Sequence, residues 1–190
     1  MLVQIANDPW VPGEPSIPVD PAAPAPARLR AISAKVDVAR IQIRAARVSD
    51  MRAVEPIIRV FANDRLMLPK SSDQLARTFR EFVVAIDADE VVGCGALRIY
   101  NERLAEICSL AVSEPFQGIG VGKRLVERLL EEAKSLDLQT VFALTLQPGF
   151  FEKLGFKIVP KHNFPLKVWA DCRTCPKLHA CDEIAVAVEI

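Results

Sequence analysis

Three glycines at alternate positions, Gly118, Gly120 and Gly122, separate an apolar run from an amphipathic segment and limit the possible folds of this chain. The apolar run, residues 107–112, has the character of a strand, whereas residues 123–133 repeat apolar side chains at helical spacing. Glycine allows a sharp turn and a close approach of the backbone to a ligand. The first N–H groups of a helix are unpaired and lie at the positive end of its dipole. The sequence therefore predicts an anion site, most often one for phosphate, rather than a plain strand-to-helix turn.

The composition is typical of a globular protein that binds neither nucleic acid nor membrane. Of the 190 residues, 51% are apolar, which suffices for a sizeable core. The 24 basic and 24 acidic residues give a net charge of zero, so charge indicates no polyanionic partner. No apolar run has the length of a transmembrane helix. Residues 1–10 lack a signal-peptide pattern and the five cysteines are an odd number, which together favour a cytoplasmic location.

The first 40 residues differ in composition from the remainder. Seven prolines fall within the first 26 residues, mixed with alanines. Proline fixes φ and removes a backbone donor, so this stretch favours an extended chain over a packed element. We interpret residues 1–40 as a disordered leader, with a docking arm for a partner as the alternative, and residues 41–190 as the folded domain.

Across the rest of the chain, apolar periodicity alternates between strand and helix spacing. Strands are predicted at residues 38–45, 81–86, 91–100, 104–112, 140–146, 156–159 and 184–190. Helices are predicted from Met51, behind an N-cap at residues 49–50, and at residues 72–81, 121–136 and 150–154. Short turns join the second to fourth strands into an antiparallel meander, and the third helix is a crossover to a parallel strand. The fold class is therefore α/β (α+β) with a mixed sheet.

With these features the sequence resembles the GCN5-related N-acetyltransferase (GNAT) superfamily over residues 41–160. The superfamily signature Q/R-x-x-G-x-G/A is matched by Gln117, Gly120 and Gly122. A second segment, F-F-E-K-L-G-F at residues 150–156, is similar to the segment after the family's fifth strand. The resemblance implies a mixed sheet of about six to seven strands with about four helices, and a cleft where two central strands splay apart. It also implies acetyl-CoA as the co-substrate.

A closer resemblance is to the acetyltransferase domain of short bacterial N-acetylglutamate synthases. It rests on residues 66–71, 92–97 and 142–145 and on Glu106. This resemblance implies transfer of acetyl from acetyl-CoA to the α-amine of L-glutamate, the first step of arginine biosynthesis. One alternative is the same chemistry on another small amine or a peptide. Another, prompted by Phe151 and a cysteine-rich tail, is a non-catalytic module that binds acyl-CoA or a partner.

The resemblance also implies a cofactor site made mostly of backbone groups. The N–H groups that bind the pyrophosphate belong to Gln117, Gly118, Ile119, Gly120, Val121, Gly122 and Lys123. The strand end formed by Leu110, Ala111 and Val112 pairs with the pantetheine arm as an added half-strand. The N–H near Val112 then faces the thioester carbonyl as an oxyanion donor.

Acetyl transfer also needs a base, because an amine with a pKa of about 8 is mostly protonated at neutral pH. Glu106 is our candidate, since its strand leads to the acetyl position and its apolar neighbours partly desolvate it. The alternative is a carboxylate paired with Arg98 or Arg103. The superfamily's usual acid is a tyrosine where this chain has Phe151. The one tyrosine here is Tyr100, so solvent or another group must protonate the leaving thiolate.

A glutamate acceptor would bring two carboxylates, which require cations. The resemblance suggests Arg44 on the first strand and Lys70 on the loop before the second helix, with Ser71 adding a hydroxyl. Ordinary solvated surface is the alternative for each of them. The arginine that larger synthases carry after the fifth strand is replaced near residues 146–147.

The segment 168–183 departs from the superfamily pattern. Its potential zinc ligands are Cys172, Cys175, His179 and Cys181, but a second C-x-x-C half-site is absent from the sequence. A disulfide or free thiols are the alternatives, and we predict no metal site. A homodimer is compatible with the sequence.

Overall fold

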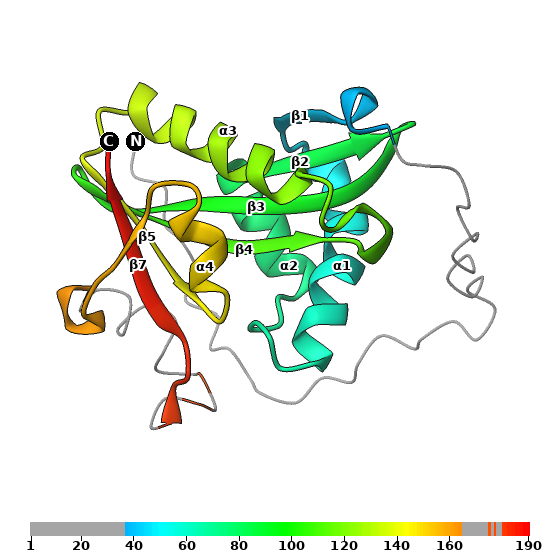
Figure 1. Cartoon of the computed structure of the whole chain (residues 1–190). Helices are drawn as coiled ribbons and strands as arrows, with labels where there is room; N and C mark the ends of the chain where they lie inside the picture. Colours follow the sequence, from blue (N-terminus) through cyan, green and yellow to red (C-terminus); the bar gives the residue numbers. More distant parts are fainter. Residues whose placement is uncertain (1–36, 165–174, 176, 178–179) are drawn as a thin grey trace, which may run out of the picture. The chain divides into compact units, whose positions relative to one another are not determined.

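The structure, a computed structural model, describes residues 37–164, 175, 177 and 180–190, which contain one seven-stranded sheet in the order β1-β2-β3-β4-β5-β7-β6 (Figure 1). The strands are β1 Gln42–Ala45, β2 Phe82–Asp87, β3 Glu90–Asn101, β4 Leu104–Val112, β5 Thr140–Thr145, β6 Lys157–Ile158 and β7 Ile184–Glu189. Neighbouring strands are antiparallel except β4 and β5, which are parallel. The predicted meander and the parallel crossover are confirmed.

Helices cover both faces of this sheet (Figure 1). The helices α3 (Val121–Ser135) and α4 (Pro148–Glu152) pack on one face, and α1 (Met51–Asn63) and α2 (Ser72–Thr78) on the other. Successive side chains of a strand point to opposite faces, so alternate residues of β2, β3 and β4 enter two separate apolar clusters. The described residues thus have the predicted mixed sheet and four helices. None of these helices combines the length and apolar character needed to cross a bilayer.

The region before α1 differs from two predictions. Residues Val38–Arg40 form a 3-10 turn, so the first strand begins only at Gln42. The carboxylate of Asp37 accepts a hydrogen bond from Ala39 N at 3.0 Å and thereby stabilises the turn. The helix α1 begins at Met51 as predicted, but the Asp50 carboxylate does not cap it. The hydrogen bond of Asp37 therefore delays the start of the strand that the apolar alternation predicted. Asp50 uses its carboxylate for Arg44 and for the N–H of Arg47 instead of capping α1.

The strands β4 and β5 separate halfway along the sheet. Their pairing runs from Leu104 opposite Thr140 to Glu106 opposite Phe142 and ends there. Beyond this point β4 remains paired with β3, and β5 with β7. Among the described strands, the second half of β4 therefore has an open edge on its β5 side, which is the splay expected from the resemblance.

Candidate active site

The open edge of β4 carries the backbone groups of Val112. The N–H of Ser113 donates to Val92 O on β3 at 2.9 Å. Backbone groups of successive strand residues point to opposite sides, so the N–H and C=O of Val112 point away from β3. The carbonyl of Val112 indeed accepts a hydrogen bond from Gln117 Nε2, at 2.8 Å. The predicted oxyanion donor therefore lies on the edge where β5 has departed.

A bulge shapes the same edge. Ser109 and Leu110 of β4 stand opposite Gly95 of β3 alone, and Ser109 adopts a φ of 52°. A Cβ atom on Gly95 would lie 3.1 Å from Cδ1 of Leu129 on α3, so the helix approaches the sheet closely here. The bulge bends β4 along the stretch that is expected to meet pantetheine.

The predicted anion site lies at the start of α3. Gly118 and Gly120 have φ values of 73° and 98°, in the left-handed region that side-chain-bearing residues avoid. Gly120 is the N-cap residue, and no described side chain caps the helix start. The N–H groups of the first turn are therefore left for solvent or a ligand. The bond from Gln117 to Val112 ties this loop to the end of β4.

Glu106 lies at the point where β4 and β5 part. Its side chain is buried, with 2% exposed. In the sheet it stands opposite Arg98 on β3 and Phe142 on β5, so the arginine of the ion-pair alternative is its cross-strand neighbour. The guanidinium of Arg103 instead donates to a glutamine. The hydroxyl of Tyr100, a partner that the sequence did not reveal, donates to Glu106 Oε2 at 2.8 Å.

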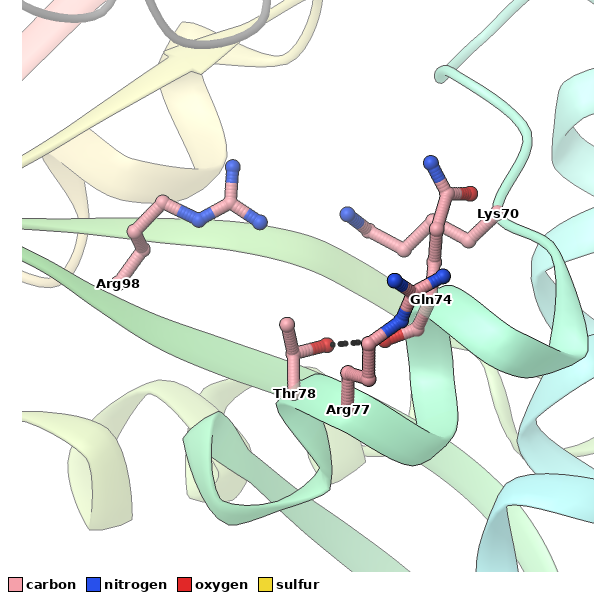
Figure 2. Close-up of a pocket in the computed structure, with 5 residues that line it drawn as sticks. All are labelled: Lys70, Gln74, Arg77, Thr78 and Arg98. Atoms are coloured by element: carbon pink, nitrogen blue, oxygen red, sulfur yellow. Dashed lines mark hydrogen bonds between the residues drawn. The ribbon is translucent and has the colours of Figure 1, made fainter. Parts of the chain in front are cut away.

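A pocket of about 240 Å³ lies on the sheet face that carries α1 and α2. The described residues that line it are Lys70, Gln74, Arg77, Thr78 and Arg98. Figure 2 shows Arg98 reaching toward this space from β3 and Lys70 from the opposite side, on the loop before α2. Residues opposite one another in a sheet project from the same face, so the pocket residue Arg98 is the cross-strand neighbour of Glu106, which is itself outside the pocket lining. A cationic cavity and a buried carboxylate are therefore linked through Arg98, which lines the first and neighbours the second.

The three predicted acceptor residues have different environments in the described part of the chain. Lys70 lines the pocket. Ser71 is the N-cap of α2, where its Oγ accepts from Gln74 N at 3.2 Å. The guanidinium of Arg44 donates two hydrogen bonds to the carboxylate of Asp50, from Nη1 to Oδ2 at 2.7 Å and from Nη2 to Oδ1 at 3.0 Å. These bonds lower the pKa of Asp50 and raise the pKa of Arg44. Arg44 is outside the pocket lining, and its role toward an acceptor stays a prediction.

Phe151, at the position of the usual tyrosine, belongs to the core. It is 4% exposed, and its ring meets those of Phe150 and Phe156 edge to face, with centroids 5.1 Å apart in both pairs. The aromatic residue at this position therefore packs α4 against the sheet.

Part of the cysteine-rich segment can be described. Cys172 and His179 lie outside the described residues, so the alternatives for this segment stay open. Among the described residues, no group of three His, Cys, Asp or Glu side chains could hold a metal ion.

Cys94 is buried within the sheet, and burial raises the pKa of its thiol to about 12, so this thiol stays protonated.

The sequence model of the Acetyltransferase (GNAT) family matches residues 47–156. The chain therefore belongs to this family and is an acetyl-CoA-dependent acyltransferase. An uncharacterized N-acetyltransferase of Chlorobaculum tepidum is 42% identical over 144 residues, which are 76% of this chain and 93% of that protein. An amino-acid acetyltransferase of Mycobacterium tuberculosis is 39% identical over 117 residues, 60% of this chain and 67% of that protein.

Solved structures agree with this assignment. The M. tuberculosis protein Rv2747, in complex with CoA and NLQ, is 30% identical with a TM-score of 0.68, over 78% of this chain and 99% of that chain. The N-acetylglutamate synthase of Neisseria gonorrhoeae, complexed with coenzyme A and N-acetyl-glutamate, has the same fold at 24% identity. Its TM-score is 0.71, over 78% of this chain and 35% of that chain. The superfamily and the likeness to the acetyltransferase domain of N-acetylglutamate synthases are thus confirmed.

Proposed function

We propose that this acetyltransferase moves the acetyl group of acetyl-CoA to the α-amine of L-glutamate, the first step of arginine biosynthesis. The observation that carries the proposal is a pocket whose described lining includes Lys70, Arg77 and Arg98 and no acidic residue, with Arg98 as the cross-strand neighbour of Glu106. A glutamate acceptor brings two carboxylates and an amine, so it requires cations next to a base. Relatives that are named amino-acid acetyltransferases support the same class of acceptor.

The two carboxylates of the acceptor would divide between the two sides of the pocket. Arg98 is the cross-strand neighbour of Glu106, so it suits the α-carboxylate, which is next to the reacting amine. Lys70 and Arg77 on the α2 side suit the side-chain carboxylate, Arg77 as a bidentate fork and Lys70 as a point charge. An acceptor that lacks this second carboxylate gains no charged contact with Lys70 and Arg77 and is therefore disfavoured.

The cofactor half of the proposed site consists of backbone groups. The N–H groups of residues 117–123 would hold the pyrophosphate at the start of α3. The open edge of β4 at Leu110, Ala111 and Val112 would pair with the pantetheine arm. With this arrangement, the thioester lies in the gap between β4 and β5, where Glu106 is also found.

The chemistry then follows from these contacts. The amine nitrogen attacks the thioester carbonyl carbon, a C–N bond forms, and the C–S bond breaks. Glu106 accepts the proton that the amine loses, and the Val112 N–H stabilises the oxyanion, which is typically worth about 3 kcal/mol of barrier. Phe151 has no proton to give, so solvent or another group must protonate the leaving thiolate of coenzyme A.

Gly120→Ala is expected to weaken binding of coenzyme A about tenfold, because a left-handed conformation costs other residues roughly 1–2 kcal/mol. Gly120 has a φ of 98°, and no heavy atom lies within 4 Å of the position of an added Cβ. The effect therefore comes from backbone strain in the loop and not from a clash. Titration calorimetry with coenzyme A measures it. Gly149→Ala is the matched control, and equal weakening in both variants would contradict the assignment.

Acetyl transfer measured over a panel of acceptors tests the proposed function. We expect L-glutamate to have the highest kcat/KM, above glutamine, aspartate, other small amines and short peptides. A clear preference for one of those would identify the acceptor as another small amine or a peptide. Tight binding of acetyl-CoA without acetylation of any acceptor would instead indicate a non-catalytic module.

A further inference from the structure

Tyr100 occupies an irregular position at the end of β3. In the ladder with β4, Ile99 stands opposite Ala105 and Asn101 opposite Leu104, so Tyr100 is the extra residue of a bulge. A bulge changes the direction of the side chain that it carries. Here the phenol hydroxyl lies 2.8 Å from Glu106 Oε2, on the neighbouring strand.

Aromatic packing restricts the ring of Tyr100. Its centroid is 5.8 Å from that of Phe142, which is fully buried and stands opposite Glu106 on β5. Phe142 stacks in turn on Phe164, with centroids 4.0 Å apart and an interplanar angle of 4°. The hydroxyl is therefore held by a packed group of rings at the point where β4 and β5 separate, and the bond to Glu106 has a defined geometry.

We propose that Tyr100 is a positioning residue for Glu106. Its hydroxyl donates to Oε2 and fixes the rotation of the carboxylate that is to accept the proton of the amine. It also stabilises the ionised carboxylate, which is the form that accepts a proton. This inference rests on the proposed role of Glu106 as the base.

The charged surroundings of Glu106 set the expected pH dependence. Arg98 stands opposite it on β3 and has Glu81 Oε2 3.5 Å from its Nε. On β5 the facing residue is Phe142, which does not titrate. An arginine side chain stays charged over the working pH range, so the positive charge of Arg98 is the same in the wild type and in a variant without the Tyr100 hydroxyl. The variant therefore differs only by the loss of one hydrogen-bond donor to the Glu106 carboxylate. The carboxylate then takes up a proton at a higher pH.

The test is Tyr100→Phe in the full chain, assayed with its best acceptor. Phenylalanine keeps the ring in the aromatic group, so the melting temperature and the affinity for acetyl-CoA are measured as folding controls. We expect kcat to fall about tenfold, with little change in KM, because hydrogen bonds to charged groups are among the stronger ones. The acid limb of the pH–rate profile should move up by about one pH unit.

A double-mutant cycle with Glu106→Gln distinguishes positioning from a purely structural role. If Tyr100 acts through Glu106, Tyr100→Phe changes kcat less than about twofold in the Glu106→Gln background. An equal loss of kcat in the wild-type and Glu106→Gln backgrounds would overturn the inference. It would also be overturned if the Tyr100→Phe single variant kept the kcat of the wild type and its rate fell in acid at the same pH. If Glu106→Gln itself keeps full activity, the proposed base is wrong, and the positioning role is rejected with it.

Discussion

Replacement of Glu106 by glutamine is expected to lower kcat about 10²–10⁴-fold, the usual contribution of a positioned general base. Glutamine has the size of glutamate and can still accept the hydrogen bond from Tyr100, but it cannot take the proton of the amine. The proposed cofactor contacts lie on the loop and on the open edge of β4, so the affinity for acetyl-CoA should not change. Steady-state kinetics and calorimetry measure the two effects separately.

A matched control is available close to the same strand. Glu102 lies exposed in the turn between β3 and β4, and Glu102→Gln removes one negative charge four residues before Glu106. This variant should keep wild-type kcat. In the wild type the rate should fall at acid pH, because the base takes up a proton and can no longer accept one from the amine. The rate of Glu106→Gln should not show this fall at acid pH. Full turnover by Glu106→Gln at every pH would exclude the carboxylate as the base.

The fold was predictable because local patterns in the sequence agree with one another. The strand before Gly118 and the helix after Gly122 define a crossover, and short turns define the meander before it. Apart from differences of a few residues at element ends, such as α2 ending at Thr78, the errors occur where a single aspartate decides the local structure. Asp37 and Asp50 bond to nearby backbone groups, and such bonds are not visible in apolar periodicity.

The site was predictable only in part, because much of it depends on the register between strands. Glu106 and the glycine loop have recognisable sequence contexts. Arg98 becomes a neighbour of Glu106 only through the pairing of β3 with β4. A bulge in β3 places Tyr100 within hydrogen-bond distance of the same carboxylate. Arg77 lies on the polar face of a short helix, which in a sequence cannot be distinguished from solvated surface. These residues become candidates only once their neighbours in space are known.

Arg77→Gln is expected to raise KM for L-glutamate about 10–100-fold, because a hydrogen bond to a charged group contributes about 1.5–3 kcal/mol. Arg77 lines the pocket, and its Nε donates to Asp73 O at 3.2 Å, which orients the guanidinium. Glutamine keeps polarity but removes the charge and the fork that suit a carboxylate. Because Glu106 and the cofactor loop are untouched, kcat should change little.

The comparison of glutamate with glutamine as acceptors makes this prediction specific. If Arg77 binds the side-chain carboxylate, Arg77→Gln lowers kcat/KM for glutamate far more than for glutamine, whose amide carries no charge to lose. Arg80→Gln is the matched control, since Arg80 is exposed, follows the same helix and is outside the pocket lining. Equal losses for both acceptors would show that Arg77 contributes only to the general potential of the pocket. The side-chain carboxylate would then have to be recognised by Lys70.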